Sequence, residues 1–208
     1  MPAARPITEA DLRRALAGPH GPARGDHDLN PSLDPPRHDL TPAAVLCPIA
    51  PRPDGFTVIL TTRPSTIRAH PGQNAFPGGK LDPTDANPLA AALRESREEI
   101  GLPPASVEVL GELERYETRT GFAVSPFVGL VAAGFAPVAE PGEVADIFEV
   151  PLDFLMDAAN HRRMSRDWKG ARRRFWAMPW RDRFIWGATA GMLRRLAERV
   201  AAARRDAA

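Results

Sequence analysis

The sequence predicts an α/β fold, in which a mixed β-sheet is covered by helices. Strand-like and helix-like segments interleave along the chain, which is typical of this fold class. Several strand-like segments follow one another with no helix between them, so part of the sheet is expected to be antiparallel. The 208 residues, of which 43% are hydrophobic, are enough for one core and few for two domains.

Residues 1–40 are expected to form a flexible N-terminal arm. Seven of the 23 prolines fall within the first 41 residues. A short helix is predicted at residues 7–17, with Thr8 as its N-cap. Residues 18–40 offer almost no side chains to bury. The domain itself is therefore assigned to residues 41–208.

The first half of the domain is predicted to contain two strands and a helix. The strands occupy residues 42–49 and 55–62, on either side of a turn that contains proline and glycine. A Gly- and Pro-rich loop at residues 63–87 leads to a helix at residues 88–100. A proline suits the first turn of that helix, and Gly101 suits its end.

The second half is predicted to contain strands at residues 107–113, 122–132 and 147–150. A short helix follows at residues 152–158, and residues 162–168 and 173–178 are predicted to pair as a hairpin around Gly170. A closing helix is predicted at residues 186–204. Its arginines are expected to form a solvated face: Arg194, Arg195, Arg199, Arg204 and Arg205. The four tryptophans are expected in the core or at a homodimer contact: Trp168, Trp176, Trp180 and Trp186.

The charge balance argues against a nucleic acid or a membrane as partner. The 27 basic and 26 acidic residues leave a formal net charge of +1, so no global field recruits a polyanion. No apolar stretch approaches the length of a membrane span. Cys47 is the single cysteine, which rules out an internal disulfide. We expect Cys47 to be a small buried residue and the protein to be cytoplasmic.

Three glutamates of the predicted helix are the main candidates for chemistry. Glu95, Glu98 and Glu99 stand at positions i, i+3 and i+4, so their carboxylates converge on one side of the helix. Such a cluster is more often a solvated surface, but it also offers the oxygen ligands that Mg²⁺ prefers. Gly78 and Gly79 favour the second interpretation, because a glycine backbone can approach a phosphate or a metal closely. The residues expected to face the core form another stripe: Leu89, Leu93, Ser96 and Ile100.

The segment at residues 79–102 resembles the Nudix box, G-x5-E-x7-R-E-U-x-E-E-x-G-U, in which U is a bulky aliphatic residue. The matching positions are Gly79, Arg94, Glu95, Glu98, Glu99, Gly101 and Leu102. Asp85 replaces the first glutamate, one extra residue separates it from Arg94, and Ser96 replaces an aliphatic residue. The resemblance implies a Nudix-like α/β/α sandwich and a pyrophosphohydrolase that uses Mg²⁺ or Mn²⁺.

A second pattern, upstream of the box, narrows the substrate. Residues 59–79 are similar to the signature of the coenzyme A pyrophosphatase subgroup, L-L-T-x-R-[SA]-x3-R-x3-G-x3-F-P-G-G. Ile59 replaces a leucine and Pro64 replaces serine or alanine, and the other defined positions agree. Residues 178–190 also resemble the end of that subgroup. The resemblance implies hydrolysis of coenzyme A to 3′,5′-ADP and 4′-phosphopantetheine.

The resemblance also implies roles for individual residues. The implied metal ligands are Glu95, Glu98, Glu99 and Gly79. The implied substrate contacts are Arg63, Arg68, Phe76, Gly78 and Gly79. The general base is expected among Glu95, Glu98 and Glu143, although Glu143 is equally compatible with a surface residue that precedes a strand. His70 is interpreted as a loop residue.

Two other functions stay open at this stage. One is a Nudix hydrolase of a different diphosphate, such as an NADH-type dinucleotide or a nucleoside sugar. The other is a Nudix-like module that binds a nucleotide without cleaving it. The second predicts damaged carboxylates, whereas Glu95, Glu98 and Glu99 are all present.

Overall fold

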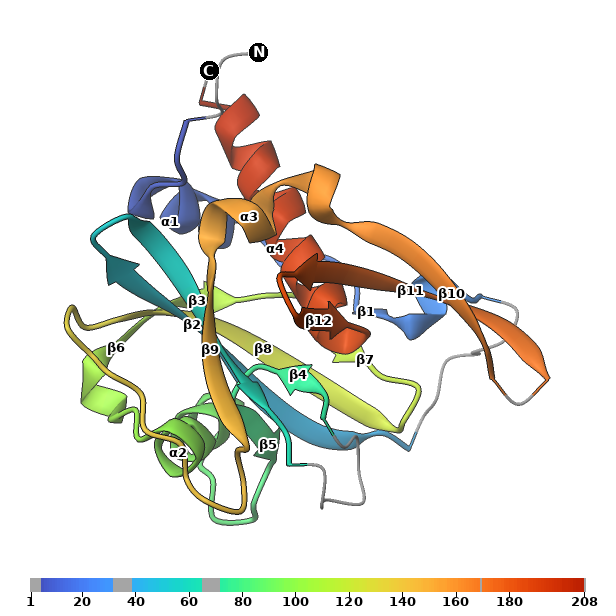
Figure 1. Ribbon diagram of the computed structural model, residues 1–208, viewed down its shortest axis with the longest axis horizontal. Helices are drawn as coiled ribbons and strands as arrows, with labels where there is room; N and C mark the ends of the chain where they lie inside the picture. Colours follow the sequence, from blue (N-terminus) through green and yellow to red (C-terminus); the bar gives the residue numbers. More distant parts are fainter. Residues whose placement is uncertain (1–4, 32–38, 65–71, 169, 208) are drawn as a thin grey trace.

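The computed structural model describes residues 5–31, 39–64, 72–168 and 170–207. These residues form a nine-stranded mixed sheet with helices on both faces and a second sheet of three strands (Figure 1). The predicted α/β fold with a mixed sheet is confirmed.

The helices and strands follow the predicted order, with additional short elements. The helices are α1 (Glu9–Ala17), α2 (Pro88–Ile100), α3 (Leu152–Met156) and α4 (Ala188–Arg205), with 3-10 turns η1 (Asp26–Asp28), η2 (Pro104–Ser106) and η3 (Ala158–Asn160). The strands of the large sheet are β1 (Arg24–Gly25), β2 (Thr41–Arg52), β3 (Gly55–Thr62), β4 (Asn74–Ala75), β5 (Gly78–Lys80), β6 (Val107–Glu112), β7 (Tyr116–Glu117), β8 (Phe122–Val131) and β9 (Asp146–Pro151). The small sheet contains β10 (Arg162–Trp168), β11 (Ala171–Trp180) and β12 (Arg183–Trp186).

The centre of the large sheet is the long parallel pair β2 and β8. Strands β3 and β5 pair antiparallel with β2, β6 and β7 pair antiparallel with β8, and β9 pairs antiparallel with β3. The sheet contains both strand directions for a simple reason. Strands β2 and β3 form a hairpin and therefore run antiparallel, whereas the long segment that contains α2 lies between β2 and β8 and allows them to run parallel.

Strand β2 is buried on both faces, which makes the molecule a sandwich. Because side chains alternate along a strand, Cys47 and Ile49 enter one core, with α1, α3 and α4, whereas Leu46 and Ala50 enter the other, with α2. Figure 1 shows α2 on the lower side of the sheet and α1, α3 and α4 on the upper side. Cys47 is 1% exposed, as expected for a small buried residue.

Helix α2 begins and ends at the predicted signals. The Asn87 side chain accepts a hydrogen bond from the Ala90 N–H at 2.9 Å, and Pro88 occupies the first helical position. Gly101 ends the helix in the left-handed conformation at φ 68°. Ser96 is fully buried where the Nudix pattern has an aliphatic residue, and its hydroxyl donates to the Ala92 carbonyl at 2.7 Å. The hydroxyl is therefore satisfied inside the core.

The prediction of a loose N-terminal arm is wrong for the described residues 5–31. Helix α1 forms with Thr8 as its N-cap, as predicted, but Leu12 and Leu16 are buried against the domain. Strand β1 adds to the edge of the large sheet beside β7. Asn30 then exchanges two hydrogen bonds with the backbone of Arg174, at 2.8 and 2.9 Å. A few apolar residues and specific polar contacts are therefore enough to order the segment.

The expectation of a solvated arginine face on the closing helix is also wrong for two residues. Arg195 and Arg199 both bond to the buried carboxylate of Glu114, at distances from 2.7 to 3.2 Å. Arg199 also donates to the Ala15 and Gly18 carbonyls. The two arginines thus join α4 to the sheet and to the N-terminal segment.

Among the described residues, no helix is both long and apolar enough to cross a membrane.

Candidate active site

One large cavity, of about 870 Å³, lies beside the acidic helix. Residues from both sheets, from α2 and from the N-terminal segment line it. Its wall contains side chains of both charges. Glutamates of α2 lie in its wall, and so do several arginines of the small sheet.

The Gly-Gly pair holds the backbone against the acidic helix. Gly78 has φ 148°, and a Cβ there would lie 2.4 Å from the Ala44 carbonyl oxygen, so a larger residue does not fit. A Cβ on Gly79 would lie 2.5 Å from the Glu95 carboxyl carbon. The Gly78 N–H donates to the Glu99 carboxylate at 3.2 Å. The glycines therefore allow the β5 backbone and the carboxylates of α2 to meet.

Glu99 is the most perturbed acid of this group. Burial is the main cause that raises its pKa to about 7, and the negative charges of Glu95 and Glu143 act in the same direction. The hydrogen bond from Gly78 and the positive charge of Arg63 oppose that rise. Glu99 is 7% exposed, so its carboxylate lies in a site where solvent does little to stabilise a negative charge.

Arg94 organises the neighbouring carboxylates. Its guanidinium donates to both oxygens of Asp85 at 3.0 Å, and it bonds to Glu95 and Glu98 at 2.9 Å each. Asp85 thus supports the arginine, despite the shorter side chain and the extra residue in the loop. Within the described part of the chain, no three acidic or histidine side chains converge as a preformed metal site. Arg94 contributes to this lack of convergence, because its guanidinium binds Glu95 and Glu98, two of the three glutamates.

Glu143 joins this group from a distant part of the sequence. It lines the same cavity. Burial is the main cause that raises the pKa of Glu95, and the charge of Glu143 acts in the same direction there, as it does at Glu99. Its loop is held to the end of α2, because the Glu140 N–H donates to the Glu99 carbonyl at 3.1 Å. The structure therefore brings Glu143 to the cavity, rather than to an unrelated surface.

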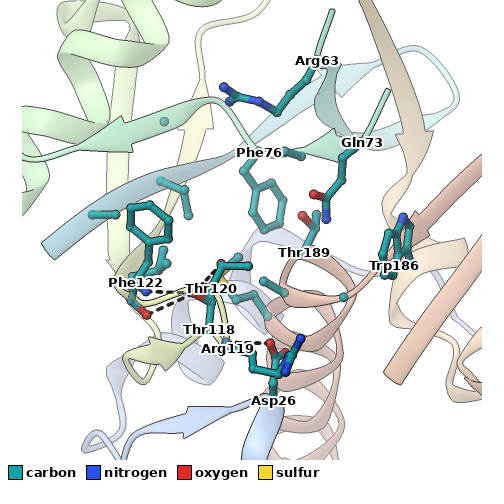
Figure 2. Close-up of a pocket in the computed structure, with 18 of the residues that line it drawn as sticks. Asp26, Arg63, Gln73, Phe76, Thr118, Arg119, Thr120, Phe122, Trp186 and Thr189 are labelled. Atoms are coloured by element: carbon teal, nitrogen blue, oxygen red, sulfur yellow. Dashed lines mark hydrogen bonds between the residues drawn. The ribbon is translucent and has the colours of Figure 1, made fainter. Parts of the chain in front are cut away.

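Four of the residues expected to contact a substrate lie in the described part of the chain, and all four line the cavity: Arg63, Phe76, Gly78 and Gly79. Figure 2 shows Arg63 and Phe76 on one side of the opening and Phe122 facing the same space. Gln73 and Thr189 stand beside Phe76 in this view. Arg68 and His70 lie outside the described residues.

The small sheet and the N-terminal segment provide the rest of the cavity wall, which the sequence did not reveal. The tryptophans were not expected beside a ligand site, yet Trp168 and Trp186 line the cavity, and Trp168 is 38% exposed. Arg166 and Asp26 line it as well. The sequence contained one indication of this wall, because Arg166 and Trp168 stand two residues apart on β10 and therefore share a face of the strand. That spacing does not show which part of the molecule the face covers.

Fold and cavity together define an α/β/α protein with a large cavity lined by both carboxylates and arginines. The NUDIX domain family matches this sequence over residues 40–168. The chain therefore belongs to the Nudix family.

Similar proteins agree with this assignment. A protein of Cronobacter sakazakii named Nudix hydrolase NudL, and described in its name as uncharacterized, is 39% identical over 172 residues, or 83% of this chain and 89% of that protein. A protein of the same name from Klebsiella pneumoniae strain 342 is 41% identical over 170 residues, or 81% of this chain and 88% of that protein. A MutT/nudix family protein of Enterococcus faecalis shares the fold, with a TM-score of 0.54 at 16% identity over 81% of this chain and 64% of that chain.

The family defines the class of reaction. The chain is a Nudix hydrolase, and the family supports hydrolysis of the pyrophosphate bond in a nucleoside diphosphate derivative. Nudix hydrolases generally use divalent metal ions such as Mg²⁺ or Mn²⁺.

Proposed function

We propose that the chain hydrolyses the pyrophosphate bond of coenzyme A or of an acyl derivative, releasing 3′,5′-ADP and 4′-phosphopantetheine. The observation that carries the proposal is the similarity of residues 59–79 to the coenzyme A pyrophosphatase signature. The described part of this segment supports it, because Arg63, Phe76, Gly78 and Gly79 line the same cavity as the acidic helix. The sequence signature and the cavity therefore coincide.

The metal ions, in this proposal, are held by Glu95, Glu98, Glu99 and the backbone carbonyl of Gly79. This set offers only oxygen ligands, which hard cations such as Mg²⁺ and Mn²⁺ prefer. Glu99 supports the assignment, since its buried carboxylate lies near two other acids and a cation would offset their mutual repulsion. When bound, the cation neutralises phosphate charge and lowers the pKa of a water molecule.

Glu143 is the preferred general base among the three candidates. Glu95 and Glu98 each accept a hydrogen bond from Arg94, so an oxygen of each carboxylate is already engaged. Glu143 faces the same carboxylates from another loop. In this proposal, Glu143 takes a proton from the attacking water.

Substrate phosphates are assigned to Arg63 and Arg68, because a guanidinium matches phosphate oxygens with a planar pair of donors. Phe76 and the Gly78–Gly79 backbone complete the proposed contacts. Phe76 presents an apolar ring and is 4% exposed, so it also anchors the loop in the core.

Product analysis of metal-dependent turnover tests the proposal. The purified chain is incubated with coenzyme A and Mg²⁺ or Mn²⁺, and the products are separated and identified. NADH, ADP-ribose and a nucleoside sugar serve as competing substrates, and a chelator serves as the metal control. We expect 3′,5′-ADP and 4′-phosphopantetheine, with coenzyme A preferred. A clear preference for another diphosphate would refute the coenzyme A assignment and leave the pyrophosphohydrolase class intact.

A further inference from the structure

Strand β10 is an exposed edge of the small sheet. Among the described residues it pairs with β11 alone, and Figure 1 shows the hairpin of β10 and β11 extending from the body of the molecule. Six of its seven residues are exposed. They include Met164 and Trp168, two of the four large apolar residues that are exposed in the described part of the chain. Such an edge presents unpaired backbone groups, so it can pair with a further strand.

The backbone groups that β10 turns outward belong to Arg163, Ser165 and Asp167. Ser165 lies opposite Arg174 of β11. The N–H and the carbonyl of Arg174 bond to the Asn30 side chain, at 2.8 and 2.9 Å, and not to Ser165. Ser165 and Arg174 are therefore a non-hydrogen-bonded pair, and the backbone groups of Ser165 point away from β11. Because the pattern repeats every second residue, Arg163 and Asp167 also face outward.

We infer that β10 pairs with β10 of a second copy of this chain, antiparallel and about a twofold axis at Ser165. In this register Ser165 lies opposite the partner's Ser165, and Arg163 lies opposite the partner's Asp167. By symmetry, Asp167 lies opposite the partner's Arg163. Each of these three pairs exchanges two hydrogen bonds, so every outward N–H and carbonyl of these residues is used. Two small sheets of three strands each thereby become one sheet of six.

The charges on β10 are complementary in this register. Arg163 and Asp167 share a face of the strand, and each lies opposite the oppositely charged residue of the second copy. Two ion pairs result by symmetry. Within the single chain, no described residue forms an ion pair with either side chain. Both charges are therefore available to a partner.

The neighbouring registers place like charges opposite each other. An axis at Arg163, Arg166 or Asp167 would place that residue opposite its own copy. An axis at Met164 would place Arg162 opposite Arg166. Like charges that lie directly opposite in a sheet are destabilising. Of these five registers, the proposed one alone avoids them.

The same register covers the exposed apolar side chains and extends the cavity wall. Both apolar residues lie on the other face of β10, together with Arg162 and Arg166. Trp168 lies opposite the partner's Arg162, whose guanidinium can stack on the ring. Met164 lies opposite the partner's Arg166, whose aliphatic part covers it. Because Trp168 lines the cavity, the partner's Arg162 adds a positive charge at the margin of the cavity.

Sedimentation velocity of the full chain over a range of concentrations tests the pairing. We expect the wild-type chain to dimerise. Arg163→Asp brings two aspartates opposite each other, and Asp167→Arg brings two arginines opposite each other. Each variant alone should therefore raise the dissociation constant of the dimer by roughly 10- to 100-fold. In an equimolar mixture of the two variants, opposite charges face each other again, so the mixture should dimerise about as strongly as the wild type.

Asp182→Arg is the matched control. Asp182 lies in the turn between β11 and β12 of the same sheet, and its side chain is 81% exposed. Its replacement makes the same change of charge away from β10, so the dissociation constant should stay within about threefold of the wild-type value.

A proline at the centre of the edge tests the backbone pairing. Ser165→Pro removes an outward N–H without removing a hydrogen bond to β11, so a variant that melts like the wild type should lose the dimer. A wild-type chain that stays monomeric at its highest soluble concentration would overturn the inference. A dimer that survives in both charge variants would do the same, and so would a mixture of the two that stays monomeric.

Discussion

At the scale of single residues, the site depends on the close approach of a glycine pair and two glutamates, Glu95 and Glu99. Gly78 and Gly79 allow the β5 backbone to lie against α2, and Glu99 is buried beside them. A buried carboxylate without a strong cationic partner reduces stability, so its presence indicates a functional rather than a structural requirement. Arg94 and Asp85 hold the neighbouring side of the cluster.

The substitution Glu99→Gln tests the metal assignment. It removes one charged oxygen while preserving the shape of the side chain. We expect kcat at saturating Mg²⁺ to fall by roughly 10²-fold or more, because electrostatic stabilisation in the site is lost. Turnover of a folded variant is the measurement. Glu108→Gln, at an exposed glutamate paired with Arg13, should keep normal turnover. Near-normal turnover of Glu99→Gln would remove Glu99 from the set of ligands.

At the scale of elements, Glu114 connects three segments that are distant in sequence. It lies between β6 and β7, it accepts hydrogen bonds from Arg195 and Arg199 of α4, and it accepts one from the Gly21 N–H. Burial alone would raise the pKa of Glu114, but the hydrogen bonds, led by that from Arg195, outweigh it and lower this pKa to about 2. The ionised carboxylate is therefore more stable in the folded chain than in the unfolded chain.

The pH dependence of stability follows from the direction of that shift. A lowered pKa adds stability above the unfolded value of 4.5, and this contribution is lost as the pH falls from there toward 2. We expect Glu114→Gln to lower the free energy of unfolding at pH 7 by roughly 3 kcal/mol. The difference from wild type should shrink as the pH falls through this range.

Urea unfolding at a series of pH values measures both effects. Glu9→Gln, at an exposed glutamate of α1 paired with Arg13, should change the free energy of unfolding by at most about 1 kcal/mol. A difference between Glu114→Gln and wild type that stays constant from pH 7 to pH 3 would show that the ion pairs contribute no pH-dependent stability.

At the scale of the whole molecule, the N-terminal segment is a structural part of the domain. It fills the core with Leu12 and Leu16, and it adds Asp26 and Asn30 to the wall of the cavity. Asp26 accepts hydrogen bonds from the Tyr116 hydroxyl and from the Arg119 N–H, both at 2.9 Å. Removal of this segment would therefore open both the core and the cavity.

The substitution Leu12→Ala measures the contribution of this segment. Leu12 is fully buried, so we expect the free energy of unfolding to fall by about 2–5 kcal/mol, as for other buried leucines. Arg13→Ala, at the exposed neighbouring position, should cost about 1 kcal/mol or less. Denaturant unfolding provides the values. An unchanged stability for Leu12→Ala would mean that α1 does not pack on the domain in solution.

Much of the fold and the acidic part of the site were predictable from local patterns. The apolar run of β2 and the caps of α2 act through neighbouring residues, so a linear sequence contains the information. The same is true of Glu95 and Glu99, which share a side of a helix because they stand four residues apart. The resemblance to the Nudix box rests on the same short range of sequence.

Only the tertiary structure decided which distant segments meet around the cavity. The sequence predicts solvated arginines on α4 and tryptophans in the core or at a homodimer contact, yet Arg199 binds the buried Glu114 and Trp168 lines the cavity. Such contacts join residues that are far apart in the chain, and their free energy depends on burial and on loop closure rather than on local propensity. The sequence by itself determined the acidic helix and the Gly-Gly turn, whereas long-range packing determined which side chains face them.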